Sequence, residues 1–389
     1  KRFGLGEGKA PPLLVSVRSG APVSMPGMMD TVLNLGLTLE GVEALARATG
    51  NPRFAWDSLR RLLAMYGEVV LGERPEVFEG MLSALKAERG VGTDAALGPE
   101  DLEELAYRSL RHLEARGTPF PLDPWAQLQG AIEAVFKSWQ NPRARTYRRI
   151  YGIPEDLGTA VVVQAMVFGN LGEDSGTGVG FTRNPATGEK GLYGEYLRNA
   201  QGEDVVAGVR TPEPLERLKG YAPGLYEELL QVAERLERHF RDMQDFEFTV
   251  ERGRLFLLQT RAGKRTAQAA VRIAVEMAEE GLISREEAVM RVEANALPGL
   301  LRPSVDRDQA PRPLLKGLPA SPGAAVGHAA FTNEAVERFH AQGLPAVLVR
   351  PETTPEDITG MYLAKGILTA RGGLTSHAAV VARGLGVPA

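Results

Sequence analysis

The hydrophobic pattern changes from helical to strand-like near residue 157, and this change constrains the fold more than any other feature. Before it, apolar residues recur at helical spacing in 37–50, 52–71, 75–90, 99–117 and 124–139. After it, the pattern is typical of strands and hairpins, in 157–170, 172–191 and 245–261. A buried strand is also expected at 13–20. The sequence therefore predicts a mixed α/β (α+β) fold with a helical insertion at about 37–155.

A second division is expected near 300–313, where the polar, proline-rich stretch LLRPSVDRDQAPRP reads as a linker. It follows a helical connector at 265–295. Beyond it, GAAVGHAAFT, PAVLVR and GILTA read as strands that lead into a helix. We therefore expect one domain at 1–262, a helical connector and linker at 263–313, and a further domain at 314–389.

Composition excludes several classes of protein. The 389 residues carry 45 basic and 49 acidic side chains, which is no nucleic-acid footprint. The basic cluster at 141–150 could attract an anion or form a solvated helix face. The chain has no cysteine, which excludes disulfides and thiolate zinc sites. No apolar run approaches the ~18 residues of a membrane span and no signal peptide is visible, so a cytoplasmic protein without membrane contact is expected.

The stretch GGLTSHAAVVARG, residues 372–384, is the first candidate site. It reads as a glycine turn and then a helix whose first turn holds Thr375, Ser376 and His377. Free N–H groups and the helix dipole at such a terminus stabilise an anion and disfavour imidazolium. His377 would then be a neutral nucleophile able to accept a phosphoryl group. The alternative is a capped helix in which His377 is incidental.

Two further segments carry polar groups suited to phosphate and metal. Asp245 and Glu247 lie two apart on one predicted strand, and Gln259 and Arg261 alternate likewise on its partner, so all four should share a face. Such oxygens suit Mg²⁺, with the arginine beside it for phosphate, although structural salt bridges would also explain the pattern. Arg18, at a strand end before a long turn, could hold a phosphate or form a surface salt bridge.

The glycine-rich stretch GEDSGTGVGFTRNPATG, residues 172–188, is less specific. Its glycines and threonines suggest a mobile loop that either closes over a nucleotide or only connects strands. It is no Walker A motif, because no GK[ST] follows.

Taken in order, these segments resemble pyruvate, phosphate dikinases. The resemblance is carried by SVRSGAPVSMPGMMDTVLNLGL, SGTGVGFTRNPATGE, NAQGEDVVAG, DMQDFEFTVERGRLFLLQTRAGKR and LTARGGLTSHAAVVARGLGVPA. It implies an ATP-grasp domain that binds Mg·ATP, a swivelling β/α phosphohistidine domain, and a barrel for pyruvate or phosphoenolpyruvate. The implied phosphotransferase reaction converts ATP, phosphate and pyruvate to AMP, diphosphate and phosphoenolpyruvate.

The resemblance also assigns residues. His377 matches the phosphoryl-accepting histidine, and Thr375 matches a threonine that a regulatory kinase/phosphatase modifies in some members. The remaining matches are to the ATP and Mg²⁺ site: Arg18, Arg61 (in preference to Arg60), Met166, Glu203, Asp245, Glu247, Gln259 and Arg261. Of these, Asp245, Glu247 and Gln259 are the ones implied to hold Mg²⁺ together with ATP.

The sequence departs from the family pattern at both ends. Nothing corresponds to the family's glycine-rich lobe with its ATP-contacting lysine, or to the barrel, and Pro22 stands where an arginine is common. We therefore expect a fragment with an incomplete N-terminal lobe and a truncated phosphohistidine domain. It would carry the ATP and phosphate half-reaction only and need not be active alone; the full-length enzyme could be a homodimer. The alternatives are a phosphoenolpyruvate synthase-like dikinase and a catalytically incomplete phosphocarrier or regulatory module.

Overall fold

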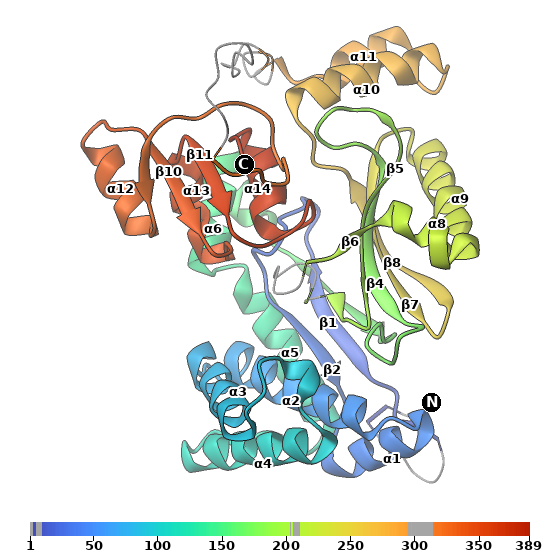
Figure 1. Cartoon of the computed structure of the whole chain (residues 1–389), viewed down its shortest axis with the longest axis vertical. Helices are drawn as coiled ribbons and strands as arrows, with labels where there is room; N and C mark the ends of the chain where they lie inside the picture. Colours follow the sequence, from blue (N-terminus) through green and yellow to red (C-terminus); the bar gives the residue numbers. More distant parts are fainter. Residues whose placement is uncertain are drawn as a thin grey trace. The chain divides into compact units, whose positions relative to one another are not determined.

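The computed structural model describes residues 3–4, 10–202, 204, 211–294, 297, 300 and 314–389. The chain divides into two compact units, Lys1–Met166 and Val167–Ala389 (Figure 1). Both units mix helices and strands, as the sequence predicts.

The first unit combines a small antiparallel sheet with a group of helices. The strands β1 (Val15–Gly20), β2 (Thr31–Leu35) and β3 (Ala160–Ala165) pair in the order β2-β1-β3. The helices are α1 (Leu39–Thr49), α2 (Pro52–Val69), α3 (Pro75–Arg89), α4 (Pro99–Ala115), α5 (Pro124–Ser138) and α6 (Pro142–Tyr151), with 3₁₀ turns at Asp94–Ala96 and Glu155–Leu157. The five helices expected from periodicity are therefore confirmed to within a few residues at each end.

Most of these helices begin at a proline, which lacks the N–H that the first helical turn leaves unbonded. Side-chain caps add to this signal: Asn51 accepts from Phe54 at the start of α2, and Asp123 accepts from Ala126 at the start of α5. Local chemistry thus fixes the helix starts.

The basic cluster at 141–150 forms helix α6, but its face is not wholly solvated as predicted. Arg148 is fully buried and donates to the Trp139 carbonyl at 2.7 Å and to Glu155 Oε2 at 2.6 Å. Its guanidinium also lies 4.0 Å from the centre of the Trp139 ring. The predicted solvated face is wrong at Arg148 because the partners of this side chain lie outside the helix.

The second unit contains two sheets. A five-stranded antiparallel sheet has the order β6-β5-β4-β7-β8, from β4 (Gly176–Arg183), β5 (Lys190–Arg198), β6 (Glu213–Pro214), β7 (Gln244–Glu251) and β8 (Arg254–Ala262). A parallel sheet has the order β11-β10-β9, from β9 (His328–Ala330), β10 (Ala346–Arg350) and β11 (Gly366–Thr369). The helices are α8 (Leu218–Tyr221), α9 (Pro223–Phe240), α10 (Ala267–Glu279), α11 (Arg285–Arg291), α12 (Asn333–Ala341), α13 (Ile358–Leu363) and α14 (His377–Leu385), with 3₁₀ turns at Leu215–Arg217 and Pro355–Asp357.

Helices cover both faces of the five-stranded sheet (Figure 1). On one face Phe246 and Phe248 pack with Leu229 of α9. On the other, Val179 and Phe181 pack with Ile273 of α10. Side chains alternate between the two faces along a strand. The residues next to Phe246 on β7 therefore point to the opposite face, which α10 covers. Asp245 and Glu247 therefore lie on that face.

The glycine-rich segment contains the strand β4, and the expectation of a mobile loop is wrong for Gly176–Arg183. Every residue of β4 is buried. A Cβ on Gly180 would lie 2.3 Å from the Phe246 ring, and one on Gly178 would lie 2.5 Å from the Phe248 ring. Glycine is required here because aromatic rings from β7 pack directly on the backbone of β4.

Candidate functional site

The β7–β8 hairpin brings together the four polar residues that the sequence predicts on one face. Asp245 is paired with Arg261 and Glu247 with Gln259 in the strand register. Arg261 Nε donates to Asp245 Oδ1 at 2.7 Å, and its Nη2 lies 3.2 Å from Glu247 Oε1. The predicted hairpin geometry is confirmed, and Arg261 bridges the two carboxylates.

The surroundings of Asp245 shift the pKa of its carboxyl. Burial raises the pKa of its carboxyl to about 6, although the Arg261 guanidinium acts in the opposite direction. The neighbouring Glu247 carboxylate adds to the rise. A buried carboxylate with a raised pKa is typical of functional sites, where a ligand can supply the missing charge.

Helix α14 presents His377 at its first position. Ser376 is the N-cap: its Oγ accepts from the Ala379 N–H and donates to the Gly373 carbonyl at 2.8 Å. Thr375 precedes the cap, so the expectation that it lies in the first helical turn is wrong. His377 is 7% exposed, and its Nδ1 lies 3.0 Å from Thr353 Oγ1.

Three residues beside this site were missed by sequence reasoning. The first, Glu195 of β5, accepts hydrogen bonds from the segment before α14. The second is Thr353, which contacts the imidazole. The third, Arg383 of α14, donates to the carbonyls of Leu374 (2.7 Å) and Ala320 (3.1 Å). An arginine inside the apolar run AAVVARGLG was the one available signal.

Arg383 also connects the helix electrostatically to the sheet. Its guanidinium lies 5.8 Å from the centre of the Phe181 ring on β4. Burial lowers the pKa of Arg383 to about 10, while the Glu195 and Asp245 carboxylates oppose that change. The charges of two buried acids of the sheet therefore act on one buried cation of α14.

The other predicted site residues belong to the first unit or lie outside the described residues. Arg18 is on β1, opposite Thr31 and Val162. Arg61 on α2 donates to Asp57 at 2.9 Å. Burial of Asp57 opposes ionisation, but Arg60 and Arg61 outweigh it and hold the Asp57 pKa well below its usual range.

Met166 and Glu203 complete the set. Met166 follows β3, and its N–H donates to the Leu14 carbonyl at 2.9 Å. Glu203 lies outside the described residues.

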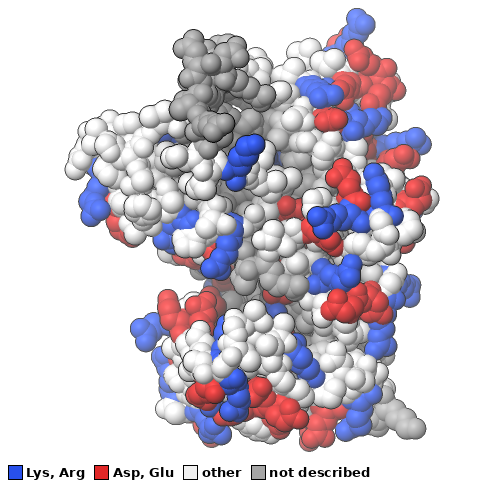
Figure 2. Space-filling view, viewed as in Figure 1, with Lys and Arg blue, Asp and Glu red and all other residues white. Residues whose placement is uncertain are grey.

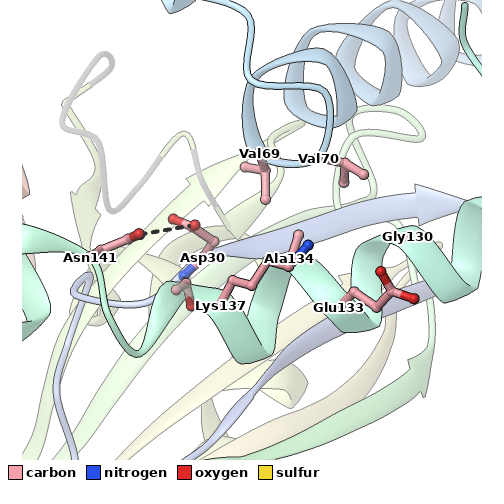
Figure 3. Close-up of a pocket in the computed structure, with 9 residues that line it drawn as sticks. Asp30, Val69, Val70, Gly130, Glu133, Ala134, Lys137 and Asn141 are labelled. Carbon is pink, nitrogen blue, oxygen red and sulfur yellow. Dashed lines mark hydrogen bonds between the residues drawn. The ribbon is translucent and has the colours of Figure 1, made fainter. Parts of the chain in front are cut away.

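A small cavity of about 190 Å³ lies in the first unit (Figure 3). It is lined by Asp30, Lys137 and Asn141, among others, and Asn141 donates to Asp30 at 3.1 Å. The cavity contains none of the predicted site residues.

On the face drawn in Figure 2, basic and acidic side chains are interspersed.

The hairpin suits Mg²⁺ by donor chemistry. Asp245, Glu247 and Gln259 offer hard oxygen atoms on one face, as Mg²⁺ prefers. Within the described ranges no group of three or more His, Cys, Asp or Glu side chains could hold a metal alone. Two carboxylates and an amide therefore fit an ion whose other ligands are phosphate and water.

None of the helices in the described part of the chain is long and apolar enough to cross a membrane.

The fold and the site define a class: an α/β nucleotide-binding domain of the ATP-grasp kind, followed by a β/α domain with a histidine at a helix N-terminus. Residues 2–220 and 225–282 match the family model described as pyruvate phosphate dikinase, AMP/ATP-binding domain. Residues 344–389 match that of the PEP-utilising enzyme mobile domain. The chain belongs to the pyruvate, phosphate dikinase family.

Curated relatives agree along almost the whole chain. Pyruvate, phosphate dikinase of Clostridium symbiosum is 56% identical over 390 residues, which cover 99% of this chain and 44% of the relative. The enzyme of Rhizobium meliloti (strain 1021) is 56% identical over 97% of this chain and 43% of its own length. Pyruvate, phosphate dikinase 1, chloroplastic, of Arabidopsis thaliana is 57% identical over 96% and 39%. The chain thus spans less than half the length of these relatives.

Proposed function

We propose that this chain performs the ATP and phosphate half-reaction of a pyruvate, phosphate dikinase, with His377 as the phosphoryl carrier. One observation carries the proposal. Helix α14, which begins at His377, and the Asp245–Glu247–Arg261 hairpin lie in one compact unit. Arg383 of that helix lies 5.8 Å from the centre of the Phe181 ring, and Phe181 is opposite Asp245 in the strand register. A nucleophile, a cation for phosphate and oxygen ligands for Mg²⁺ are then available together.

In the proposed reaction, Nε2 of His377 attacks the β-phosphorus of ATP, and the bond to the α-phosphate oxygen breaks to release AMP. The γ-phosphoryl group then passes to inorganic phosphate, which yields diphosphate and leaves phosphohistidine. For Nε2 to hold a lone pair, the neutral imidazole carries its proton on Nδ1. Thr353 Oγ1, 3.0 Å from Nδ1, would accept the hydrogen bond from this N–H group.

The other residues act on charge. Arg261 offers a planar donor fork to the phosphate oxygens once ATP competes with its present carboxylate partners. Asp245, Glu247 and Gln259 would hold Mg²⁺, which neutralises the phosphate charge when bound. Arg18, Arg61, Met166 and Glu203 are proposed nucleotide contacts on the strength of the family match. Pyruvate or phosphoenolpyruvate would react with the portion of the relatives that lies outside the matched region.

Domain boundaries and regulation remain proposals as well. We assign nucleotide binding to 1–262 and phosphoryl carriage to 314–389, joined by 263–313. Thr375 is the proposed target of a regulatory kinase/phosphatase, because a phosphate there would add ~2 negative charges beside His377.

The test is transfer of label from ATP carrying ³²P at the β position. We expect acid-labile, alkali-stable label on the chain and none on His377→Ala, because no other described imidazole lies at this helix terminus. His340→Ala, an exposed histidine of α12, is the matched control and should label normally. EDTA should abolish labelling.

Equal labelling of His377→Ala would refute the carrier assignment. ATP binding without any label in the parent chain would instead favour the catalytically incomplete carrier module.

A further inference from the structure

Gln201 is buried, but its side-chain amide has no hydrogen-bond partner among the residues that the structure describes. The residue is 4% exposed, and the statement holds for both Nε2 and Oε1. Its main chain is satisfied, because the Gln201 N–H donates to Asp204 Oδ2 at 2.9 Å and the Gln201 carbonyl accepts from the Asp204 N–H at 3.0 Å. Burying an amide without partners costs free energy, and buried polar groups in folded proteins are nearly always paired. The Gln201 amide therefore needs a partner from outside the described residues.

Close packing of the main chain fixes the position of Gln201. The Ala200 N–H donates to the Gly169 carbonyl at 2.9 Å. A Cβ on Gly169 would lie 2.3 Å from the Ala200 carbonyl oxygen and 2.6 Å from that of Gly176, so three segments meet just before Gln201. Asn170, which follows Gly169, has a second buried amide oxygen, Oδ1, without a partner in the described part of the chain. Two amides in need of a partner thus lie on segments that are hydrogen bonded to each other.

These segments lie one step along the sheet from the proposed phosphate site. In the strand register Thr177 of β4 is opposite Thr249 of β7, and the next residue of β7 on the same face is Glu247. Successive side chains on one face of a strand are about 7 Å apart. A Cβ on Gly202, the residue after Gln201, would lie 3.9 Å from Thr177 Oγ1. The chain at Gln201 therefore reaches the face that carries the proposed Mg²⁺ ligands.

Apolar side chains fill the same face in the opposite direction. Beyond Asp245, Met243 packs with Ile273 of α10. A nucleotide whose phosphates lie at the Asp245 hairpin and that follows this face therefore extends its nucleoside toward Thr177 and Gln201.

We propose that Gln201 recognises the adenine of ATP through its side-chain amide. The inference rests on the proposed function, because that function places the nucleotide on this face. An amide with one donor and one acceptor group matches the edge of adenine, where the N6 amino group donates and N7 accepts. Guanine offers two acceptors there, O6 and N7, so the amide can pair with only one of them. Gln201 makes the site prefer ATP to GTP.

The substitution Gln201→Met separates recognition from packing. It keeps the length of the side chain and removes the two polar atoms, so the free energy of unfolding of the nucleotide-free chain should stay the same or rise. Binding of ATP with Mg²⁺, measured by equilibrium dialysis, should become about tenfold weaker, while binding of GTP changes by less than about twofold. Gln231→Met, at an exposed glutamine of α9, should change neither nucleotide. A Gln201→Met chain that binds ATP as tightly as the parent chain would overturn the proposal.

An ATP analogue with carbon in place of N7 tests the contact itself. The parent chain should bind it about fivefold more weakly than ATP, because one hydrogen bond is lost. Gln201→Met should bind the analogue and ATP equally well, since the group that contacts N7 is gone. Equal binding of the two ligands by the parent chain would overturn the proposal, whether the amide contacts ribose or water instead. Absence of label on His377 at unchanged ATP binding would contradict the proposed function and leave this inference standing.

Discussion

At the scale of single residues, the proposed role of His377 depends on which ring nitrogen carries the proton. The imidazole is buried and its Nδ1 is engaged by Thr353 Oγ1. In the proposed carrier role, Nδ1 holds the proton and donates to Thr353 Oγ1, which leaves Nε2 as the nucleophile. Sequence reasoning found His377 through its helix-start motif but could not find Thr353. The two residues meet only because β10 and β11 pair in parallel and the loop after β10 reaches the α14 segment.

Thr353→Val keeps the shape of this side chain and removes its hydroxyl. We expect the labelling rate to fall about fivefold, since one hydrogen bond is worth about 1 kcal/mol. The ¹⁵N chemical shifts of the His377 ring should show a smaller share of the Nδ1-protonated tautomer. ATP affinity should be unchanged, because the hydroxyl does not belong to the proposed nucleotide contacts.

Thr353→Ser is the matched control, because it keeps the hydroxyl and should restore both the rate and the tautomer. If Thr353→Val retains the parent tautomer and labels at the parent rate, Thr353 is only a packing residue.

At the scale of elements, the sequence pattern predicted the structure correctly where the paired elements are close in sequence. The β7–β8 hairpin was predictable because alternation and a tight turn fix the register, so the shared face of Asp245, Glu247 and Arg261 followed. Strand β4 lies in the segment 172–191 that was predicted as a hairpin, but the expectation that its glycines form a mobile loop was wrong. The reason for those glycines lies in Phe246 and Phe248, about 70 residues further along the chain. For the same reason, Glu195 could not be connected with α14.

Gly180→Ala tests whether these glycines serve packing or a nucleotide loop. Because the added Cβ would lie 2.3 Å from the Phe246 ring, we expect the free energy of unfolding to fall by about 1–3 kcal/mol. Urea denaturation of the purified chain measures this. Gly172→Ala is the control, since its Cβ would meet only Asp174 Oδ1 at 3.4 Å, and it should change stability by less than about 0.5 kcal/mol. Lost ATP binding at unchanged stability would favour the loop interpretation instead.

At the scale of the whole molecule, compactness divides the chain differently from the predicted domains. The predicted boundary near 300–313 falls inside the second compact unit, Val167–Ala389. That unit contains both the five-stranded sheet and the parallel sheet, and the Glu195 contacts run between the first sheet and α14. A sequence pattern marks where a chain can bend, whereas compactness depends on which surfaces meet. The predicted domain ranges stay a prediction, and the contact at α14 is tertiary information that a sequence pattern does not contain.

The two matched family segments lead to a prediction about the chain as a whole: it should run the ATP half-reaction in both directions and leave pyruvate untouched. Groups that stabilise the transition state of phosphoryl transfer stabilise it equally in reverse. Chain labelled from β-³²P-ATP and phosphate should therefore return the label to ATP when AMP and diphosphate are added with Mg²⁺. Pyruvate alone should leave the label on His377.

Label at the γ position sharpens this experiment. Without inorganic phosphate, the chain should retain γ-³²P because a diphosphoryl group stays on His377. With phosphate, that label should appear in diphosphate, while β-³²P remains on the protein. His340→Ala controls for labelling at other histidines, and both label positions are counted on the same preparation. Release of label by pyruvate alone would place the second half-reaction within this chain, and γ-label retained in the presence of phosphate would exclude the proposed order of transfers.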